Sequence, residues 1–348
     1  MLNNFVTIII PTRNEAKYID VLINSIINQD IDKSKVEIIF IDGLSTDSTQ
    51  NIIKNYLKKY PFIRLIENPH KTVPYALNLG IQHAKGDIII RIDSHAEYPS
   101  NYVSTLVYYL QKLNADNVGA LCETLPGSGT KVAKSIAISL SSIFGVGNAT
   151  FRLNKKVNEE FIPVDTVPFG CYRREVFNNI GLFDEQLTRN QDNEFNERLL
   201  KAGGKIYLIP SLRIKYFARE TYSKLYRMFF QYGYFGPLVD IKLKRPTRLR
   251  RYIPTLFVLA LVTLPLAGLL IPFFLYLWLF VVLLYVVAAF SFAAYECAKR
   301  SKIVLVPFVM WAYFTSHISY GLGYLSGFID FVVRRLHLKK KVDVEISR

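Results

Sequence analysis

The sequence predicts an α/β fold, a doubly wound parallel sheet flanked by helices, followed by a C-terminal region of long apolar helices. Two observations predict the sheet: runs rich in β-branched residues alternate with segments of helical length, and each run ends in a polar loop. One observation predicts the apolar helices: residues 253–295 contain no charged residue, although the formal net charge is +15. With 348 residues, the chain is long enough for one large domain, or for a domain plus an appendage.

Hydrophobic periodicity and turn residues place the elements of the N-terminal part. We expect strands at residues 5–10, 36–41, 63–66 and 87–92. We expect helices between them at residues 16–28, 47–60 and 75–84. The second helix begins at Asp47-Ser48-Thr49, residue types that commonly cap helices, and Gly86 ends the third. Because helices of this length separate the strands, the strands should pair in parallel.

Three polar loops follow predicted strands, and they begin at Pro11, Asp42 and Asp93. Ligands bind beyond the carboxyl ends of the strands in sheets of this kind, so the loops should meet in one crevice. Each loop taken alone has a simpler explanation, as a helix cap or an ordinary turn. Three acidic loops after successive strands are much less often explained as three separate caps or turns. We therefore expect a shared binding site.

The side chains of these loops suit a nucleotide. The first loop offers a hydroxyl, an amide and a carboxylate to a ribose or a base edge, from Thr12, Asn14 and Glu15. Asp42 can accept a hydrogen bond from a base. Asp93 and His95 can hold a divalent cation that bridges a diphosphate, although a lone histidine is more often structural.

The same periodicity continues after the third loop. We expect helices at residues 102–113 and 131–144, and strands at residues 117–122, 164–169 and 205–210. Arg173 and Arg174 follow the second of these strands and could face a diphosphate or a lipid phosphate. Two solvated arginines at the start of a helix explain them equally well.

Residues 253–295 have the composition of membrane helices. The stretch is too long for one crossing and fits two of about 20 residues each, at 253–272 and 273–296. Basic residues precede it without an intervening acid: Lys242, Lys244, Arg245, Arg248, Arg250 and Arg251. Lys299, Arg300 and Lys302 follow it, so the positive-inside rule places both ends of this hairpin in the cytoplasm.

Residues 303–329 form a further apolar stretch, followed by a basic tail at residues 334–348. A full crossing here would place the tail outside, against the positive-inside rule, so the stretch is either a third span or a re-entrant or interfacial segment. The net charge indicates an anionic membrane surface, and no motif indicates nucleic acid. Three widely spaced cysteines without a disulfide or zinc pattern fit a reduced compartment.

Three motifs resemble those of the inverting family 2 glycosyltransferases, which have the GT-A nucleotide-diphospho-sugar transferase fold. The motifs are Pro11-Thr12-Arg13-Asn14-Glu15, Ile41-Asp42-Gly43-Leu44-Ser45-Thr46-Asp47-Ser48-Thr49 and Arg91-Ile92-Asp93-Ser94-His95-Ala96. The resemblance covers residues 5–235, and the Asp-Ser-His-Ala sequence with the apolar C-terminal region is most similar to succinoglycan-type (ExoA-like) exopolysaccharide transferases. It implies a mixed, mainly parallel sheet and a divalent metal, Mn²⁺ or Mg²⁺.

The resemblance also implies roles for the motif residues. The donor would be bound by Pro11, Thr12, Asn14, Glu15, Asp42, Ser45 and Asp93. Thr12 and Glu15 would contact the nucleoside, and Asp42 the base. Asp93 would contact the ribose or diphosphate, and with His95 would hold the metal. The commoner family motif is Asp-x-Asp, so the histidine keeps a ligand but removes a negative charge.

An inverting transfer needs a carboxylate that takes the proton of the acceptor hydroxyl. Family members usually carry Glu-Asp where this chain has Gln191-Asp192, so the resemblance implies Asp192 as general base, with Glu194 as second choice. Candidates for contacting the acceptor or its phosphate are Arg173, Arg174, Gln191, Arg227 and Gln231. The Gln-x-x-Arg-Trp motif of processive synthases is absent around Gln231, which favours single addition.

These observations predict a membrane-anchored transferase. It would move a sugar from a nucleotide-diphosphate sugar, UDP-linked by first choice, to a hydroxyl of a polyprenyl-diphosphate-linked oligosaccharide during surface polysaccharide assembly. We expect a cytoplasmic catalytic domain at residues 1–235, a juxtamembrane segment at 236–252 and transmembrane helices within 253–333, hence a multi-pass protein of the cytoplasmic membrane. Two alternatives remain: a polyprenyl-phosphate sugar synthase that acts on the lipid monophosphate, and a catalytically inert membrane scaffold with a nucleotide-sugar-binding module.

Overall fold

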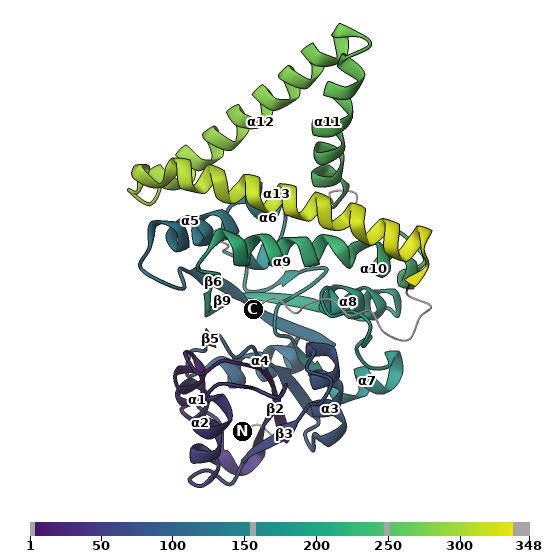
Figure 1. Ribbon diagram of the computed structural model, residues 1–348. Helices are drawn as coiled ribbons and strands as arrows, with labels where there is room; N and C mark the ends of the chain where they lie inside the picture. Colours follow the sequence, from purple (N-terminus) through teal and green to yellow (C-terminus); the bar gives the residue numbers. More distant parts are fainter. Residues whose placement is uncertain (1–3, 154–157, 247–250, 337–348) are drawn as a thin grey trace. The chain divides into compact units, whose positions relative to one another are not determined.

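The computed structural model describes residues 4–153, 158–246 and 251–336 of the chain (Figure 1). These residues divide into two compact units. The first unit is Met1–Glu123 with Asn154–Tyr216, and the second is Thr124–Leu153 with Phe217–Arg348. The sequence places the domain boundary at residue 235, whereas here residues 217–235 and 124–153 group with the C-terminal helices.

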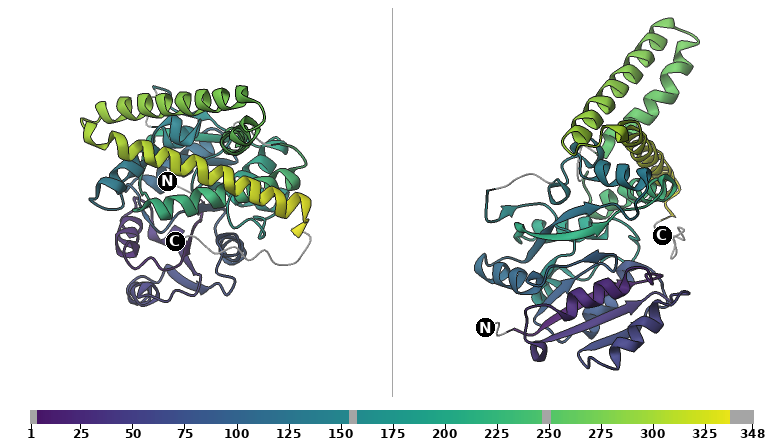
Figure 2. Two further views of the ribbon diagram at one scale, coloured as in Figure 1. Left: turned by 45° about the horizontal axis from the view of Figure 1, so that its top comes forward. Right: turned by 90° about the vertical axis from the view of Figure 1, so that its left-hand side faces the viewer.

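The first unit is built on a sheet whose N-terminal strands are parallel. Strand β1 (Val6–Thr12) pairs in parallel with β2 (Val36–Asp42) and β4 (Ile88–Arg91), and β2 pairs with β3 (Ile63–Glu67). Every residue of β2 and β4 is buried, which is typical of β-branched strands covered by helices on both faces. The predicted strands and their parallel pairing are confirmed (Figure 2).

An antiparallel strand makes the sheet mixed, as the family resemblance implies. Strand β8 (Cys171–Arg173) pairs antiparallel with β4 and with β6 (Asn117–Leu125), and the sheet order is β3-β2-β1-β4-β8-β6-β9-β5. Strand β9 (Ile206–Phe217) also pairs antiparallel with the short strands β5 (Ala96–Glu97) and β7 (Ile162–Pro163). The chain direction therefore reverses next to β4.

Two predicted strands differ from the structure. The strand predicted at residues 164–169 is wrong: β7 ends at Pro163, and Phe169 has a φ of +50°, a left-handed conformation that a strand excludes. The strand predicted at residues 205–210 instead continues to Phe217. It continues because Leu212, Ile214 and Tyr216 stay buried while the residues between them are exposed, which is the alternation of a half-buried strand.

Helices connect these strands in the first unit. They are α1 (Ile19–Ile27), α2 (Thr49–Leu57), α3 (Val73–His83), α4 (Tyr102–Lys112), α7 (Arg174–Ile180) and α8 (Gln191–Lys201). The helices α1, α2 and α4 lie within the predicted ranges, whereas α3 begins two residues before its predicted start. A 3₁₀ turn at Lys33–Lys35 precedes β2, and Asp32 caps it by accepting a hydrogen bond from the Ser34 N–H.

The second unit is helical. It contains α5 (Lys131–Leu140), α6 (Ile143–Val146), α9 (Tyr222–Tyr234), α10 (Gly236–Leu243), α11 (Tyr252–Gly268), α12 (Pro272–Ala298) and α13 (Val306–Phe328). Short 3₁₀ turns lie at Thr150–Arg152 and Ile303–Leu305, and a π turn at Ile329–Val333 extends α13. Helix α13 packs along α9 and contacts α5, α10, α11 and α12 (Figure 1).

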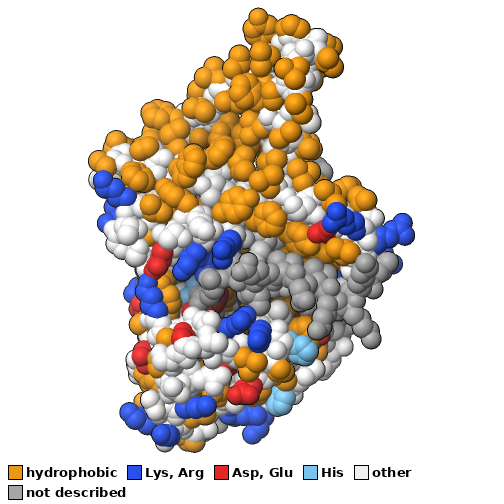
Figure 3. Space-filling view, in the orientation of Figure 1, with side chains coloured by type: hydrophobic (Ala, Val, Ile, Leu, Met, Phe, Trp, Pro, Cys, Tyr) orange, Lys and Arg blue, Asp and Glu red, His pale blue; other side chains and the backbone are white. Residues whose placement is uncertain are grey.

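Helices α11 and α12 form a hairpin with an exposed apolar surface (Figure 3). The segments Pro272–Ala298 and Ile303–Val333 are long and apolar enough to cross a membrane, by length and composition, whereas Tyr252–Gly268 is shorter. The predicted segments 253–272, 273–296 and 303–329 thus correspond to three helices. The predicted basic tail is described only as far as Leu336.

We expect Gly86 to be required for packing against β1. An added Cβ at Gly86 would lie 2.5 Å from the Thr7 nitrogen and 2.8 Å from the Phe5 oxygen. The Gly86→Ala substitution should therefore destabilise the protein by about 1–3 kcal/mol and lower its thermal unfolding midpoint in detergent. Gly129→Ala is the matched control, because nothing lies within 4 Å of its added Cβ. Equal midpoints for the two variants would contradict this packing.

Candidate active site

The carboxyl ends of β1, β2 and β4 lie side by side, as the sequence predicts. Thr12 pairs in register with Asp42, and the Gly43 N–H donates to the Thr12 carbonyl at 2.8 Å. The Ile92 N–H, just after β4, donates to the Ile9 carbonyl at 3.1 Å. The Thr12 hydroxyl donates to the carbonyl of Ile10. The three polar loops therefore leave the sheet at one edge.

Hydrogen bonds fix the first two loops to each other. The Asn14 N–H donates to the Ser45 hydroxyl at 2.9 Å, and the Asn14 side-chain oxygen accepts from the Thr46 N–H at 2.8 Å. Asn14 has a φ of +53°, a conformation that asparagine tolerates better than most residues. Asn14 and Ser45, both predicted to bind the donor, thus lie at the predicted edge and hold its loops together.

Asp42 is fully buried at the end of β2. Its carboxylate accepts hydrogen bonds from the Ser45 N–H at 2.8 Å, from the Ser45 hydroxyl, and from the Gln50 side chain at 2.6 Å. An ionised carboxylate offers about four acceptor positions, so these three bonds orient Asp42 and leave capacity for one further donor. The contact of Asp42 with a base stays a prediction.

A cluster of metal-ligand types lies between the first and third loops. One ligand atom each from Glu15, Asp93 and His95 falls within 4.8 Å of the others. The His95 Nδ1 lies 2.8 Å from an Asp93 carboxylate oxygen and 3.7 Å from a Glu15 carboxylate oxygen. Glu15 and His95 are buried, while the Asp93 side chain is 24% exposed.

Neighbouring residues hold this cluster in place. The Glu15 N–H donates to the Thr49 hydroxyl at 2.8 Å, and the His95 ring packs against Tyr216 with centroids 5.0 Å apart. The Asp93 N–H donates to the Tyr98 hydroxyl at 2.8 Å. Burial raises the pKa of Tyr98 well above its ordinary value, so this hydroxyl stays neutral. Two carboxylates and an imidazole form a donor set that fits a divalent cation such as Mn²⁺.

Asp192 lies in the first turn of α8 and forms an ion pair with Arg91, the last residue of β4. Arg91 is nearly buried, and the Asp192 side chain is 29% exposed. Burial opposes the charge of Arg91, but the carboxylates of Asp192 and Asp93 outweigh it and raise the pKa of the guanidinium. The predicted base is therefore joined to the end of β4, two residues before Asp93, and Arg91 stays charged.

Arg91 is itself held by the segment before β8. Its N–H donates to the Gly170 carbonyl at 3.0 Å, and its guanidinium lies 5.7 Å from the centre of the Phe169 ring. Phe169 stacks on Tyr216 with centroids 6.3 Å apart, and Tyr216 also contacts His95. One continuous set of side-chain contacts thus connects the metal-ligand cluster with the ion pair.

The surroundings of Asp192 differ from those of Glu194, the second choice of general base. Both carboxylate oxygens of Glu194 accept hydrogen bonds from Arg198, at 2.6 Å and 3.0 Å, and Glu194 is buried. Arg198 also donates to the carbonyls of Ile180 and Leu182, so this pair joins α8 to the preceding loop. Glu194 therefore has a structural role, and Asp192 remains the candidate. The neighbouring Gln191 is buried.

Arg173 and Arg174 lie away from this edge. In the antiparallel pairing, Arg173 is opposite Ile88, at the start of β4 and therefore at the other end from Asp93. Arg173 donates to the carbonyls of Leu110 and Ala115. Arg174 donates to the carbonyls of Ala84 and Gly86. Both arginines therefore lie at the end of β4 opposite the candidate site. The predicted Arg227 and Gln231 belong to α9 in the second unit, and their contact with an acceptor stays a prediction.

Sequence reasoning missed Arg91, Tyr98 and Gln50. Arg91 had a usable signal, since it is the one charged residue in the apolar run Ile88–Ile92. A charge in a buried strand needs a partner, which here is Asp192. Glu15 was assigned to the nucleoside, whereas the structure places its carboxylate beside His95. No local sequence pattern distinguishes these two roles.

The chain is similar to a solved structure of the same architecture. This structure is the mannosyltransferase PcManGT from Pyrobaculum calidifontis, solved in complex with GDP-Man and Mn²⁺. The superposition covers 95% of this chain and 88% of PcManGT, with a TM-score of 0.59 and 17% sequence identity. The fold is therefore of the GT-A class of nucleotide-diphospho-sugar transferases, as the motifs indicated.

The sequence comparisons identify the family. The Glycosyl transferase family 2 model matches residues 7–181. The dolichyl N-acetyl-alpha-D-glucosaminyl phosphate 3-beta-D-2,3-diacetamido-2,3-dideoxy-beta-D-glucuronosyltransferase of Methanococcus voltae is 31% identical over 66% of this chain and 72% of its own length. The succinoglycan biosynthesis protein ExoA of Rhizobium meliloti is 28% identical over 65% and 67%. The chain belongs to glycosyl transferase family 2, whose enzymes use nucleotide sugars in glycan and polysaccharide biosynthesis.

We expect Glu15 to contribute to metal affinity. The Glu15→Gln substitution removes a carboxylate charge from the cluster, so Mn²⁺ binding in the presence of UDP should weaken roughly tenfold or more; even the loss of an outer partner of a metal ligand typically weakens affinity by 10–100-fold. Titration calorimetry measures this change, and a chelator should abolish the signal.

The matched control for this substitution is Glu67→Gln, at the exposed end of β3. Its Mn²⁺ affinity should equal that of the unsubstituted protein. Unchanged affinity in Glu15→Gln would exclude Glu15 from the metal site and return it to the predicted nucleoside contact.

Proposed function

We propose that the protein is an inverting glycosyltransferase that transfers one sugar from a nucleotide-diphosphate sugar to a hydroxyl of a lipid-linked saccharide. The observation that carries the proposal is the Arg91–Asp192 ion pair, formed at the last residue of the strand that precedes Asp93 and His95. It supplies a partly exposed carboxylate next to the cluster suited to a metal and a diphosphate. UDP-linked sugars are the first choice of donor.

Asp192 has the properties of a general base for this reaction. The acceptor hydroxyl would give its proton to the Asp192 carboxylate while its oxygen attacks the anomeric carbon. The bond from that carbon to the diphosphate oxygen breaks, and its electron pair leaves with the nucleoside diphosphate. Arg91 favours the ionised carboxylate and fixes its direction, which makes Arg91 a positioning residue. Inversion at the anomeric carbon follows from attack on the face opposite the leaving group.

The cluster of Glu15, Asp93 and His95 would hold the divalent cation that family members use, Mn²⁺ or Mg²⁺. When bound, such a cation neutralises the charge that develops on a departing diphosphate. The chain itself orients the donor: Asp42 is fixed by Ser45 and Gln50 to meet a base.

Two observations support a lipid-linked acceptor. The name of the Methanococcus voltae relative describes transfer to dolichyl N-acetylglucosaminyl phosphate, a sugar on a lipid phosphate. The second unit carries exposed apolar helices flanked by Arg251, Lys299 and Lys302, a composition suited to an anionic membrane surface. We therefore infer that the protein is attached to the cytoplasmic membrane from its cytoplasmic side, and that its acceptor is a polyprenyl-diphosphate-linked oligosaccharide for a surface polysaccharide.

We expect Asp192→Asn to lose sugar transfer to a hydroxyl by about 10²–10⁴-fold, the usual contribution of a general base. Metal-dependent binding of UDP should remain, because Asp192 lies outside the metal-ligand cluster. Initial rates with a radiolabelled donor and a polyprenyl-diphosphate-linked saccharide measure the loss. Asn193→Ala, the next residue on α8, is the matched control and should keep its activity.

The same assay separates the rival functions. Retained transfer by Asp192→Asn to a polyprenyl monophosphate, whose oxygen is already anionic, would identify a polyprenyl-phosphate sugar synthase. Binding of a nucleoside diphosphate to the unsubstituted protein without sugar transfer to either acceptor would identify an inert scaffold.

A further inference from the structure

The turn of the α11–α12 hairpin is apolar throughout. It runs from Gly268 to Pro272, and the side chains of Leu269 and Leu270 are 83% and 86% exposed. Phe273 and Phe274 continue it, and Phe273 is 64% exposed. A loop that emerges on the far side of a bilayer meets lipid headgroups and water, where exposed leucines and phenylalanines are unfavourable. This turn has the composition of a segment that stays in hydrocarbon.

The backbone N–H groups of the turn also have hydrogen-bond partners, as a segment within the hydrocarbon core requires. The N–H groups of Leu269, Leu270 and Ile271 donate to carbonyls of the last turn of α11, at 3.3 Å, 3.1 Å and 3.0 Å. Pro272 has no N–H, and the Phe274 N–H donates to the Ile271 carbonyl at 3.1 Å. An N–H without a partner costs several kcal/mol in a bilayer core, so loops rarely lie there. In this turn the helical hydrogen bonding continues almost without a break.

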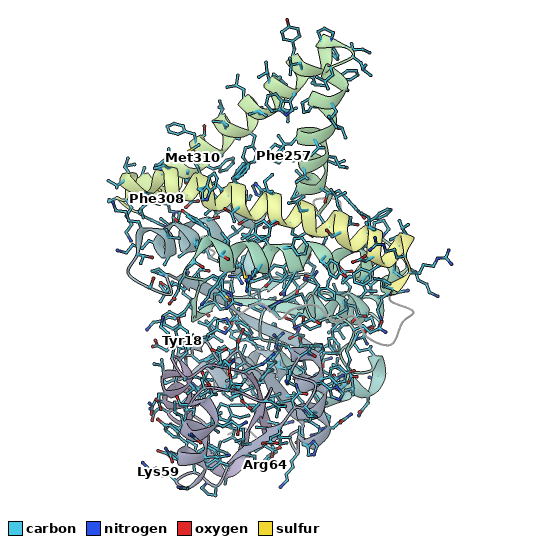
Figure 4. All side chains as sticks on the ribbon, in the orientation of Figure 1. Tyr18, Lys59, Arg64, Phe257, Phe308 and Met310 are labelled. Atoms are coloured by element: carbon cyan, nitrogen blue, oxygen red, sulfur yellow. The ribbon has the colours of Figure 1, made fainter. Side chains whose placement is uncertain are left out.

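The hairpin is short beyond its contacts with α13. Helix α11 packs on α13 at its first turns, where a Cβ on Gly321 would lie 2.5 Å from the Pro254 carbonyl oxygen and 2.6 Å from Val258. Phe257 of α11 is labelled in Figure 4. Its ring stacks on that of Tyr285 of α12, with centroids 4.4 Å apart. From Val258 α11 continues only to Gly268, a reach of about 15 Å, and from Tyr285, which contacts His317 of α13, α12 extends back to Pro272 over about 20 Å. Both reaches are shorter than the hydrocarbon core, which is about 30 Å thick.

The packing of α13 on α9, at the base of the hairpin, also favours an orientation of α13 along the membrane surface. Helix α13 packs backbone to backbone on α9, with Gly323 against the Phe230 carbonyl and Gly327 against the Tyr234 carbonyl. The outer side of α9 carries the exposed cations Lys224 and Arg227. If α13 crossed the bilayer, α9 would enter with it, and each cation would cost about 2.5–3.5 kcal/mol at the centre. An orientation of α13 along the surface keeps both cations in water.

We propose that α13 lies along the membrane surface and that the α11–α12 hairpin enters one leaflet and turns back within the hydrocarbon. The lipid acyl chains of that leaflet are the occupant of the exposed hairpin surface. The chain then makes no full crossing, and both ends of the hairpin and the π turn after α13 stay on one side. The inference rests on the proposed membrane attachment and replaces the two or three crossings that the sequence predicts.

Leu270→Cys at the tip and Lys302→Cys at the base test this topology. The native cysteines Cys122, Cys171 and Cys297 are buried, so the unsubstituted protein gives the labelling background. A membrane-impermeant maleimide is added to intact cells, to cells opened to the cytoplasm, and to detergent extracts. We expect Lys302→Cys to be labelled once the cytoplasmic side is accessible, and Leu270→Cys only in detergent.

Lipid-depth quenching provides the second measurement. A fluorophore attached to the Leu270→Cys variant in vesicles should be quenched more strongly by spin labels near the ends of the acyl chains than by labels near the headgroups. Stronger quenching near the headgroups, or labelling of Leu270→Cys from outside intact cells, would show that the hairpin crosses and would overturn the proposal. Labelling of Leu270→Cys in a detergent-free soluble fraction would instead refute the membrane attachment itself.

Discussion

The ion pair between Arg91 and Asp192 is the interaction on which the catalytic arrangement depends. It joins the central strand β4 to the first turn of α8, two elements 101 residues apart in the chain. Arg91 is nearly buried, so removing its partner would leave an uncompensated charge in the interior, which typically costs 3–5 kcal/mol. The same pair holds the carboxylate that we propose as general base beside the end of β4, two residues before Asp93. The Arg91–Asp192 pair therefore contributes both to the stability of the fold and to the proposed catalytic arrangement.

The sequence predicts the parallel half of the sheet well, because each β-branched run ends in a polar loop and parallel strands bring such loops to one edge. Thr12, Asp42 and Asp93 meet there for this reason. Arg173 and Arg174 illustrate what it does not predict. We expect them to follow a strand at residues 164–169, whereas Arg173 ends the antiparallel strand β8 and Arg174 begins α7, which places both at the opposite end of β4 from Asp93. Strand direction is set by tertiary pairing, which no local pattern encodes.

Contacts between residues far apart in the chain are a second feature that local sequence patterns do not predict, both in the candidate site and in the helical unit. Glu15 reaches His95 across two loops, so its place in the metal-ligand cluster depends on contacts 80 residues apart. Composition alone identifies the C-terminal helices as apolar. It does not show that α13 packs backbone to backbone on the cationic helix α9, a contact between residues more than 90 positions apart. That contact, and not the hydropathy of α13, determines which orientation in a bilayer is favourable.

A double-mutant cycle of Arg91→Gln and Asp192→Asn, measured as kcat/KM for sugar transfer, tests the central claim most directly. If Arg91 acts by positioning the Asp192 carboxylate, the double variant should transfer at the rate of Asp192→Asn alone, because the effects of residues that act as a unit are not additive. Additive losses, with Arg91→Gln as harmful in the Asp192→Asn background as in the unsubstituted protein, would contradict the account.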